Sequence, residues 1–246
     1  MLTPSMPYIT NSMETTAAVA RAPKSQLTIE KLELDAPRSN EILVKLTAVG
    51  ICHTDIAMRD RACPVPQPIV LGHEGSGVVA AVGASVSKVK HGDRVVMSFN
   101  SCGSCESCLE NKPSYCHDFW GCNFAGARAD RSSPLHKGPE SIHGNFFGQS
   151  SFADHALCTE RNIVKVRSDA PLELLGPLAC GIQTGAGAVI NALKVGPGKK
   201  FAVFGVGSVG LSAVMAAHLV GAGTIIAIDM HPERLKQAWS WVPLTL

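Results

Sequence analysis

Four cysteines in one short stretch limit what this chain can fold into more than any other feature. They follow the spacing Cys-x2-Cys-x2-Cys-x7-Cys, at Cys102, Cys105, Cys108 and Cys116. Thiolates with this spacing can turn inward on a tight loop and meet one tetrahedral zinc ion. Because the protein would supply all four ligands, such a site holds a loop together and leaves no position open for chemistry. An iron–sulfur cluster is the alternative metal group for the same spacing.

The composition is that of a globular protein with one large or two modest domains. The 246 residues are 46% hydrophobic and 17% charged, with a net charge of +2. No run of Lys or Arg occurs, so neither nucleic acid nor an anionic membrane is expected as a partner. The first two dozen residues lack the apolar stretch of a signal peptide, and the first twelve resemble a loose extension. We therefore expect a cytoplasmic protein whose nine cysteines bind metal or act in catalysis rather than form disulfides.

Two patterns divide the chain. Short β-rich runs such as 42–49, 77–82 and 94–98 are separated by glycines, which predicts a small barrel or sandwich. Residues 100–150 are rich in Cys, Gly, Ser and Asn, which predicts a long loop held by the four cysteines. After Pro177 the pattern changes to alternating helix and strand. We predict a first domain over 1–175 and a second over 176–246.

An uncharged apolar run from Phe201 to Ile228 is long enough to cross a bilayer as a helix. Five glycines interrupt it, however, at positions 205, 207, 210, 221 and 223. This punctuation favours a buried strand, a helix and a second buried strand, as in a parallel sheet covered on both faces.

The same region carries the pattern Gly-x-Gly-x-x-Gly, at Gly205, Gly207 and Gly210. An apolar strand over 200–204 precedes it, a helix over 208–220 can follow, and 224–228 can form the second strand. Glycines there permit a tight turn and close approach of a pyrophosphate to the helix N-terminus. Asp229 ends the second strand, where a carboxylate binds ribose hydroxyls and favours NAD over NADP. Arg234 argues for NADP, and a glycine-rich unit without a nucleotide is the alternative.

A second, scattered set of metal-ligating residues comprises Cys52, His73 and Cys180. Two thiolates and one imidazole would leave the fourth zinc position for water or substrate. Zinc in such a site acts as a Lewis acid and lowers the pKa of a bound hydroxyl. Their spacing alone does not identify them, and each by itself is more often a packed residue.

Taken together, these motifs resemble the zinc-dependent medium-chain alcohol dehydrogenases. The resemblance runs from about Thr15 to Ala238 and rests on Gly50-Ile-Cys-His-Thr-Asp55, Gly72-His-Glu-Gly-Ser-Gly77, the four-cysteine loop, Pro177-Leu-Ala-Cys-Gly181 and Gly205-Val-Gly-Ser-Val-Gly210. Residues 146–153, Phe-Phe-Gly-Gln-Ser-Ser-Phe-Ala, resemble the aryl alcohol dehydrogenase branch. The resemblance implies a mixed β and α/β fold, with a GroES-like β-barrel catalytic domain followed by the first β-α-β of an incomplete Rossmann domain.

By the same resemblance, Cys52, His73 and Cys180 hold the catalytic zinc, and Glu74 lies behind it. Thr54 accepts the alcohol proton. Asp55 orients His73, as outer partners of metal-bound histidines do. His53 either lies against the cofactor pyrophosphate or is a solvated loop residue. Some relatives end the proton relay at a histidine whose position is occupied here by Ala57.

The family resemblance assigns no role to two other groups of residues. Cys63, Cys122 and Cys158 match no ligand position and are interpreted as structural or incidental. Phe99, Phe119, Trp120 and Phe124 flank the four-cysteine loop, where they either pack together or line a pocket for an aryl group.

The expected function is NAD-dependent interconversion of a primary, aryl alcohol and its aldehyde, with one catalytic and one structural zinc. A glutathione-dependent formaldehyde dehydrogenase and a truncated, inactive zinc-binding fragment are the alternatives. We expect truncation because a Rossmann fold has six strands and only two can be identified. A homo-oligomer is expected only for the intact form.

The C-terminal tail supports that expectation. Family members typically continue after the Ala238 position with x-Glu-Leu-Gly-Ala-Thr-His. Codons allowed for Ala238–Leu246, read from the third base of the first, encode Met-Glu-Leu-Gly-Ala-Thr-His-Thr. Our hypothesis is that the tail is a frameshifted reading of a dehydrogenase gene.

Overall fold

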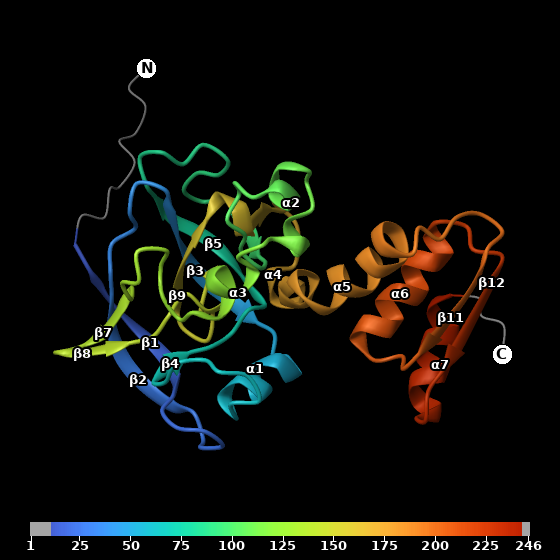
Figure 1. The fold of residues 1–246 in the computed structure, drawn as a ribbon, viewed down its shortest axis with the longest axis horizontal. Coiled ribbons are helices and arrows are strands. Elements are labelled where there is room, and N and C mark those ends of the chain that lie inside the picture. The colour runs from blue at the N-terminus through green and yellow to red at the C-terminus, as the bar shows by residue number, and fades with distance from the viewer. Residues whose placement is uncertain (1–10, 243–246) are drawn as a thin grey trace. The chain divides into compact units, whose positions relative to one another are not determined.

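The computed structural model describes residues 11–242. They form two compact units, which divide between Ala179 and Cys180 (Figure 1). This division lies four residues after the boundary placed at 175/176 from the sequence. The sequence predicts a loose extension over the first twelve residues, of which residues 1–10 lie outside the described part of the chain. Residues 243–246 of the C-terminal tail also lie outside it.

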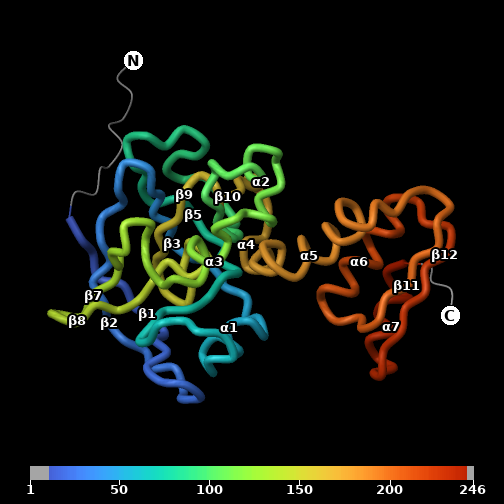
Figure 2. Tube along the Cα trace, in the orientation of Figure 1, coloured from blue at the N-terminus to red at the C-terminus, as the bar shows by residue number. Residues whose placement is uncertain are grey.

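The first unit contains a five-stranded antiparallel sheet in the order β4-β1-β2-β7-β8. Figure 2 traces the backbone of this unit through β1, β2, β7 and β8. Its strands are β1 (Met13–Ala20), β2 (Thr28–Leu34), β4 (Ile69–Val70), β7 (Leu135–Lys137) and β8 (Glu140–Ile142). In β1, alternate residues are buried at Thr15, Ala17 and Val19. That alternation is expected for a strand with one face on the core.

A second five-stranded antiparallel sheet has the order β10-β6-β5-β3-β9. It consists of β3 (Glu41–Val49), β5 (Gly75–Val82), β6 (Arg94–Met97), β9 (His155–Thr159) and β10 (Ile163–Lys165). The three predicted runs correspond to β3, β5 and β6. Leu32 and Leu34 of the first sheet share one buried cluster with Leu43 and Leu157 of the second. The barrel-like β domain expected from the sequence is therefore confirmed.

The stretch 100–150 differs from the long loop expected. It contains α2 (Glu106–Leu109), η1 (Pro113–Tyr115), α3 (Phe119–Phe124), the β7–β8 hairpin and η2 (Phe146–Gly148). These elements are three to six residues long, too short for a periodic pattern to appear in the sequence. The remaining helices of the unit are α1 (His53–Arg59), η3 (Glu160–Asn162), α4 (Leu172–Leu175) and η4 (Gly176–Ala179).

The second unit begins with α5 (Gly181–Gly187) and η5 (Ala188–Ala192). It continues with β11 (Lys200–Phe204), α6 (Ser208–Leu219), β12 (Thr224–Ile228) and α7 (Pro232–Trp241). β11 and β12 are parallel and pair from Lys200↔Thr224 to Phe204↔Ile228. The apolar run is thus strand, helix and strand, as predicted. Among residues 11–242, no single helix is long and apolar enough to span a membrane, and one bent pair, α4–η4 with α5–η5, passes that test by length and composition.

Candidate metal and cofactor sites

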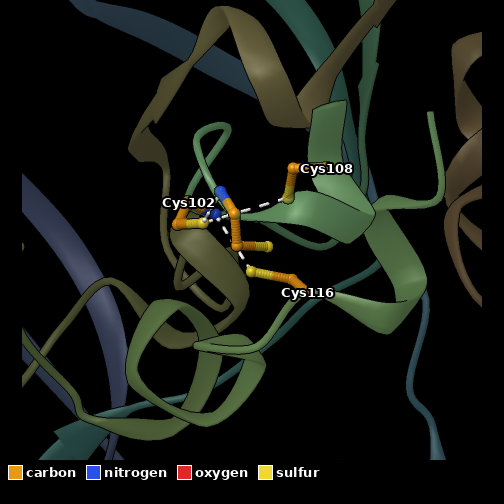
Figure 3. A group of neighbouring side chains, drawn as sticks. Cys102, Cys108 and Cys116 are labelled. Carbon is orange, nitrogen blue, oxygen red and sulfur yellow. Dashed lines mark hydrogen bonds between the residues drawn. The ribbon is translucent and has the colours of Figure 1, made fainter. Parts of the chain in front are cut away.

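The four-cysteine loop brings its sulfur atoms together as the spacing predicts. The sulfurs of Cys102, Cys105, Cys108 and Cys116 all lie within 4.8 Å of one another. Cys102 Sγ and Cys108 Sγ are 3.9 Å apart. Figure 3 shows the side chains of Cys102, Cys108 and Cys116 pointing toward one another. The short helix α2 starts directly after Cys105, which turns Cys108 back toward the other sulfurs.

Backbone amides of the loop stabilise thiolates in this group. The amide of Cys105 donates to Cys102 Sγ at 3.4 Å, and that of His117 donates to Cys105 Sγ at 3.4 Å. Hydrogen bonds from the backbone of Ser104 and Cys105 lower the pKa of Cys102 to about 6. Burial instead raises the pKa of Cys116 to about 11. Because thiolates are the species that bind zinc, the donor set and its amide partners fit a closed zinc site.

The scattered residues also converge. Ligand atoms of Cys52, His73, Glu74 and Cys180 lie within 4.8 Å of one another. Cys52 immediately precedes α1, and His73 and Glu74 immediately precede β5. Cys180 directly follows Ala179, whose carbonyl oxygen lies 3.4 Å from Ser98 Oγ at the end of β6. The four residues are up to 128 positions apart in the sequence, so their proximity depends on the fold and not on neighbouring positions in the chain.

Asp55 fixes the geometry of this group. Its carboxylate Oδ1 lies 2.9 Å from His73 Nδ1 and accepts the Gly72 amide at 3.1 Å. Its Oδ2 accepts the amide of Cys52 at 3.0 Å. Asp55 is 2% exposed, so these contacts are shielded from water. The arrangement directs His73 Nε2 away from the carboxylate and fits the orienting role inferred from resemblance.

The other predicted residues of this group occupy α1 and the start of β5. Thr54 Oγ1 lies 3.6 Å from Cys52 Sγ. His53 is exposed at the first position of α1. Glu74 is buried against Gly50, whose position allows no larger side chain: a Cβ there would lie 1.9 Å from Glu74 Oε2. Gly50, the first residue of the segment Gly50–Asp55 quoted for the family resemblance, thus leaves room for this carboxylate.

The glycine loop of the second unit joins β11 to α6. Gly205 has a φ of +88°, a backbone conformation that would be strained for a residue with a side chain. A Cβ on Gly210 would lie 1.8 Å from the Gly205 carbonyl oxygen, so the close passage of helix and strand requires glycine there. Gly207 is extended and immediately precedes α6. A cavity of about 520 Å³ lies along β11, this loop and the first turn of α6.

Asp229 follows β12 and holds the glycine loop from the side. Its Oδ2 accepts the Val206 amide at 2.8 Å, and its Oδ1 accepts the His231 amide at 2.8 Å. The hydrogen bond from the His231 amide, and after it the one from the Val206 amide, lower the pKa of Asp229. Arg234 Nη1 lies 3.7 Å from the carboxylate. The ionised carboxylate of Asp229 therefore lies beside the glycine loop between β11 and α6.

Comparison with known proteins decides the family. Residues 38–168, more than half of the chain, match the family described as the alcohol dehydrogenase GroES-like domain. The chain belongs to this family. The resemblance inferred from the sequence is thereby confirmed.

Individual proteins that are similar to this chain are also named as dehydrogenases. The geraniol dehydrogenase of Castellaniella defragrans is 51% identical over 219 residues, which are 89% of this chain and 58% of that protein. An alcohol dehydrogenase zinc-binding domain protein from Burkholderia ambifaria is 52% identical, with a TM-score of 0.92 over 94% of this chain and 63% of that one. Benzyl alcohol dehydrogenase from Acinetobacter calcoaceticus is 47% identical, with a TM-score of 0.90 over 95% and 63%. The chain thus spans about three fifths of the length of these alcohol dehydrogenase relatives.

Sequence reasoning missed three residues around His73 of this alcohol dehydrogenase domain. The Phe147 ring stacks on the His73 ring at 4.5 Å and 23°, and Phe146 meets it edge-on at 5.9 Å. Gln149 donates from Nε2 to the His73 carbonyl at 3.0 Å and to the Ser98 carbonyl at 3.1 Å. All three residues lie in the segment used for the branch resemblance, but aromatic and amide residues have no metal-ligand signature in a sequence.

The flanking aromatics and the remaining cysteines pack locally. The Trp120 ring is tilted at 30° to the Phe124 ring, with centroids 4.5 Å apart, and Phe124 contacts Phe146 and Phe147 at 5.9 and 5.0 Å. Phe99 and Phe119 lie 5.6 Å apart. The three cysteines that match no ligand position lie in packed surroundings. Burial raises the pKa of Cys122 to about 12 and also raises that of Cys158, while Cys63 packs at the edge of a hydrophobic cluster.

Proposed function

We propose that the chain provides the zinc-binding and initial cofactor-binding parts of an NAD-dependent alcohol dehydrogenase. The carrying observation is the convergence of ligand atoms of Cys52, His73, Glu74 and Cys180 within 4.8 Å, where His73 itself contacts the buried carboxylate of Asp55. Two cysteines and a histidine are the ligand set of zinc sites that keep one open position. Zinc bound there supplies Lewis acidity toward an alcohol oxygen.

The chain's own residues have distinct roles in this proposal. Cys52, His73 and Cys180 hold the metal, and Asp55 keeps the proton on His73 Nδ1 so that Nε2 is the ligand atom. Thr54, whose Oγ1 lies 3.6 Å from Cys52 Sγ, would accept the alcohol proton. Glu74 is the fourth residue of this group, and its carboxylate lies within 4.8 Å of the other three ligand atoms. The four-cysteine group holds a second, structural zinc.

The second unit would bind the cofactor. The open turn at Gly205 and Gly207 and the amides of the first turn of α6 suit a pyrophosphate. Asp229 presents a carboxylate where ribose hydroxyls would bind, and its charge disfavours a 2′-phosphate. His53 is proposed to contact the same pyrophosphate. These features support NAD, and Arg234 is the residue whose pairing with Asp229 would have to break for NADP to bind.

The proposed substrate is a primary aryl alcohol. Support for an aryl alcohol comes from the similarity to a benzyl alcohol dehydrogenase and from the cluster of Phe124, Phe146 and Phe147 near His73. The geraniol dehydrogenase relative makes an allylic alcohol the natural comparison substrate. A glutathione adduct is the third class to compare. We also propose a cytoplasmic location and a homo-oligomeric intact form.

The test is NADH formation from benzyl alcohol and from geraniol by the zinc-loaded chain. The proposal predicts turnover in the wild type and in the control Cys63→Ser, and loss of turnover in Cys52→Ser. The second candidate, which the same two groups of ligand residues support, is zinc binding without turnover. Two bound zinc ions without NADH formation would support that candidate. Equal turnover in the wild type and Cys52→Ser would refute the metal assignment.

A further inference from the structure

The segment 145–150 has an unusual backbone. Asn145, Phe147, Gly148 and Ser150 all have positive φ values, of 59°, 51°, 67° and 52°. Asparagine and glycine adopt this left-handed conformation readily, but a bulky residue such as phenylalanine does so at a cost in free energy. Such strain persists only where the surrounding structure enforces it, and it concentrates at functional sites. Phe147 is therefore the residue of this segment that needs an explanation.

Hydrogen bonds on both sides of Phe147 enforce its conformation. On the N-terminal side, the Phe146 amide donates to Ser150 Oγ at 2.9 Å, and Ser150 Oγ donates to the Val70 carbonyl at 2.7 Å. On the C-terminal side, Asn162 Nδ2 donates to the Gly148 carbonyl at 2.9 Å. Phe146 and Ser150 are buried, so these bonds are protected from water. The backbone of Phe147 is thus held between two fixed points.

The result of this conformation is the position of the Phe147 ring. It lies 4.5 Å from the His73 ring at an interplanar angle of 23°, a stacked arrangement. Phe146 meets the same imidazole edge-on, at 82°, and Asp55 Oδ1 holds its Nδ1 at 2.9 Å. One face, one edge and one nitrogen of His73 are therefore each constrained. The Asp55 contact alone leaves the imidazole free to tilt about the hydrogen bond, and a flat ring against its face removes that freedom.

We propose that Phe147 is a positioning residue, whose strained backbone presses its ring against His73 and fixes the plane of the imidazole for metal binding. This inference rests on the proposed metal site at Cys52, His73 and Cys180. It goes beyond that site because it assigns a role in metal affinity to a side chain that carries no ligand atom. Gly148 already has a positive φ of 67°, so the left-handed conformation of Phe147 is a second, separate constraint in the same turn.

The experiment uses the full chain loaded with Co²⁺ and measures its visible absorption spectrum and its metal affinity by competition with a chelator. Phe147→Gly removes both the ring and the backbone strain, whereas Phe147→Leu keeps the apolar volume but loses the flat face. Phe147→Tyr keeps the ring. Trp120→Ala is the matched control, because it removes an aromatic pair at the same 4.5 Å centroid distance, in which Trp120 contacts Phe124 instead of His73.

We expect Phe147→Gly and Phe147→Leu to bind one of the two metal ions about three- to tenfold more weakly, as loss of one ring contact implies. Their Co²⁺ spectra should change, while Phe147→Tyr and Trp120→Ala should match the wild type. Wild-type affinity and spectrum in both Phe147→Gly and Phe147→Leu would overturn the positioning role alone. Binding of only one metal ion by the wild type would overturn the proposed catalytic site, and the inference with it.

Discussion

The two cysteine-containing groups of this chain are built in opposite ways. The four-cysteine group lies within 15 consecutive residues, from 102 to 116, and its sulfurs are organised by short helices and local amides. The Cys52–His73–Cys180 group draws residues from the ends of α1, β5 and η4, and its organiser is the side chain of Asp55. The first group can form wherever its loop forms, whereas the second exists only when the barrel is folded. We therefore expect substitutions within the loop to weaken metal binding by the four-cysteine group. Metal binding by the Cys52–His73–Cys180 group should instead respond to substitutions elsewhere in the barrel.

Loss of the loop metal should have the largest effect. Cys108→Ser removes one of four ligands, and structural zinc contributes about 10–16 kcal/mol of apparent binding free energy in small zinc domains. We expect the stretch 100–124 to become sensitive to protease while strands β3, β5 and β6 stay protected. Limited proteolysis followed by mass spectrometry measures this. Cys122→Ser, in the adjacent helix α3, is the control and should be cleaved like the wild type.

Asp55→Asn should weaken only the fold-assembled site. Changing the outer partner of a metal-bound histidine typically lowers metal affinity by about 10- to 100-fold. Chelator competition should show one weakened ion and one unchanged ion. Asp60→Asn, at the other end of α1, is the control and should leave both affinities unchanged. Equal weakening of both ions in Asp55→Asn would contradict the independence of the two groups.

Gly50→Ala tests whether the barrel must leave room for Glu74. The added Cβ would lie 1.9 Å from Glu74 Oε2, and overpacking of this kind costs about 1–3 kcal/mol. We expect a lower midpoint of thermal unfolding for the first unit. Gly196→Ala, where a Cβ meets nothing within 4 Å, is the matched control and should unfold like the wild type. A Gly50→Ala midpoint equal to that of Gly196→Ala would show that the carboxylate moves aside freely.

The smallest effect concerns pH in the metal-free chain. The pKa of Cys102 is lowered to about 6 in the folded loop, from a usual value of 9.0. A group with a lowered folded pKa stabilises the fold above its unfolded pKa, and this contribution is lost as the pH falls toward 6. The pKa of Cys116 is raised to about 11, so its contribution is present below 9 and is lost as the pH rises toward 11. Rates of alkylation at each cysteine against pH test both directions, and a Cys102 profile centred near 9 would contradict the first.

The same contrast explains what the sequence could predict. Spacing alone identified the four-cysteine group, and glycine punctuation identified the β11–α6–β12 unit, because both depend on neighbours in the chain. Cys52, His73 and Cys180 required a family resemblance, since their proximity depends on strand pairing over long sequence distances. Phe147 could not be predicted, because its role depends on a ring plane set by a strained backbone. The short helices within 100–150 were missed because elements of three to six residues have no detectable period.

The most direct test of this account is the metal content of the purified chain, compared with that of Cys52→Ser and Cys108→Ser. The account predicts two zinc ions in the wild type and one in each variant. It further predicts that the ion kept by Cys108→Ser binds an added imidazole ligand, and that the ion kept by Cys52→Ser does not. A single zinc ion in the wild type, or imidazole binding by the ion retained in Cys52→Ser, would contradict the distinction between an open, fold-assembled site and a closed, local one.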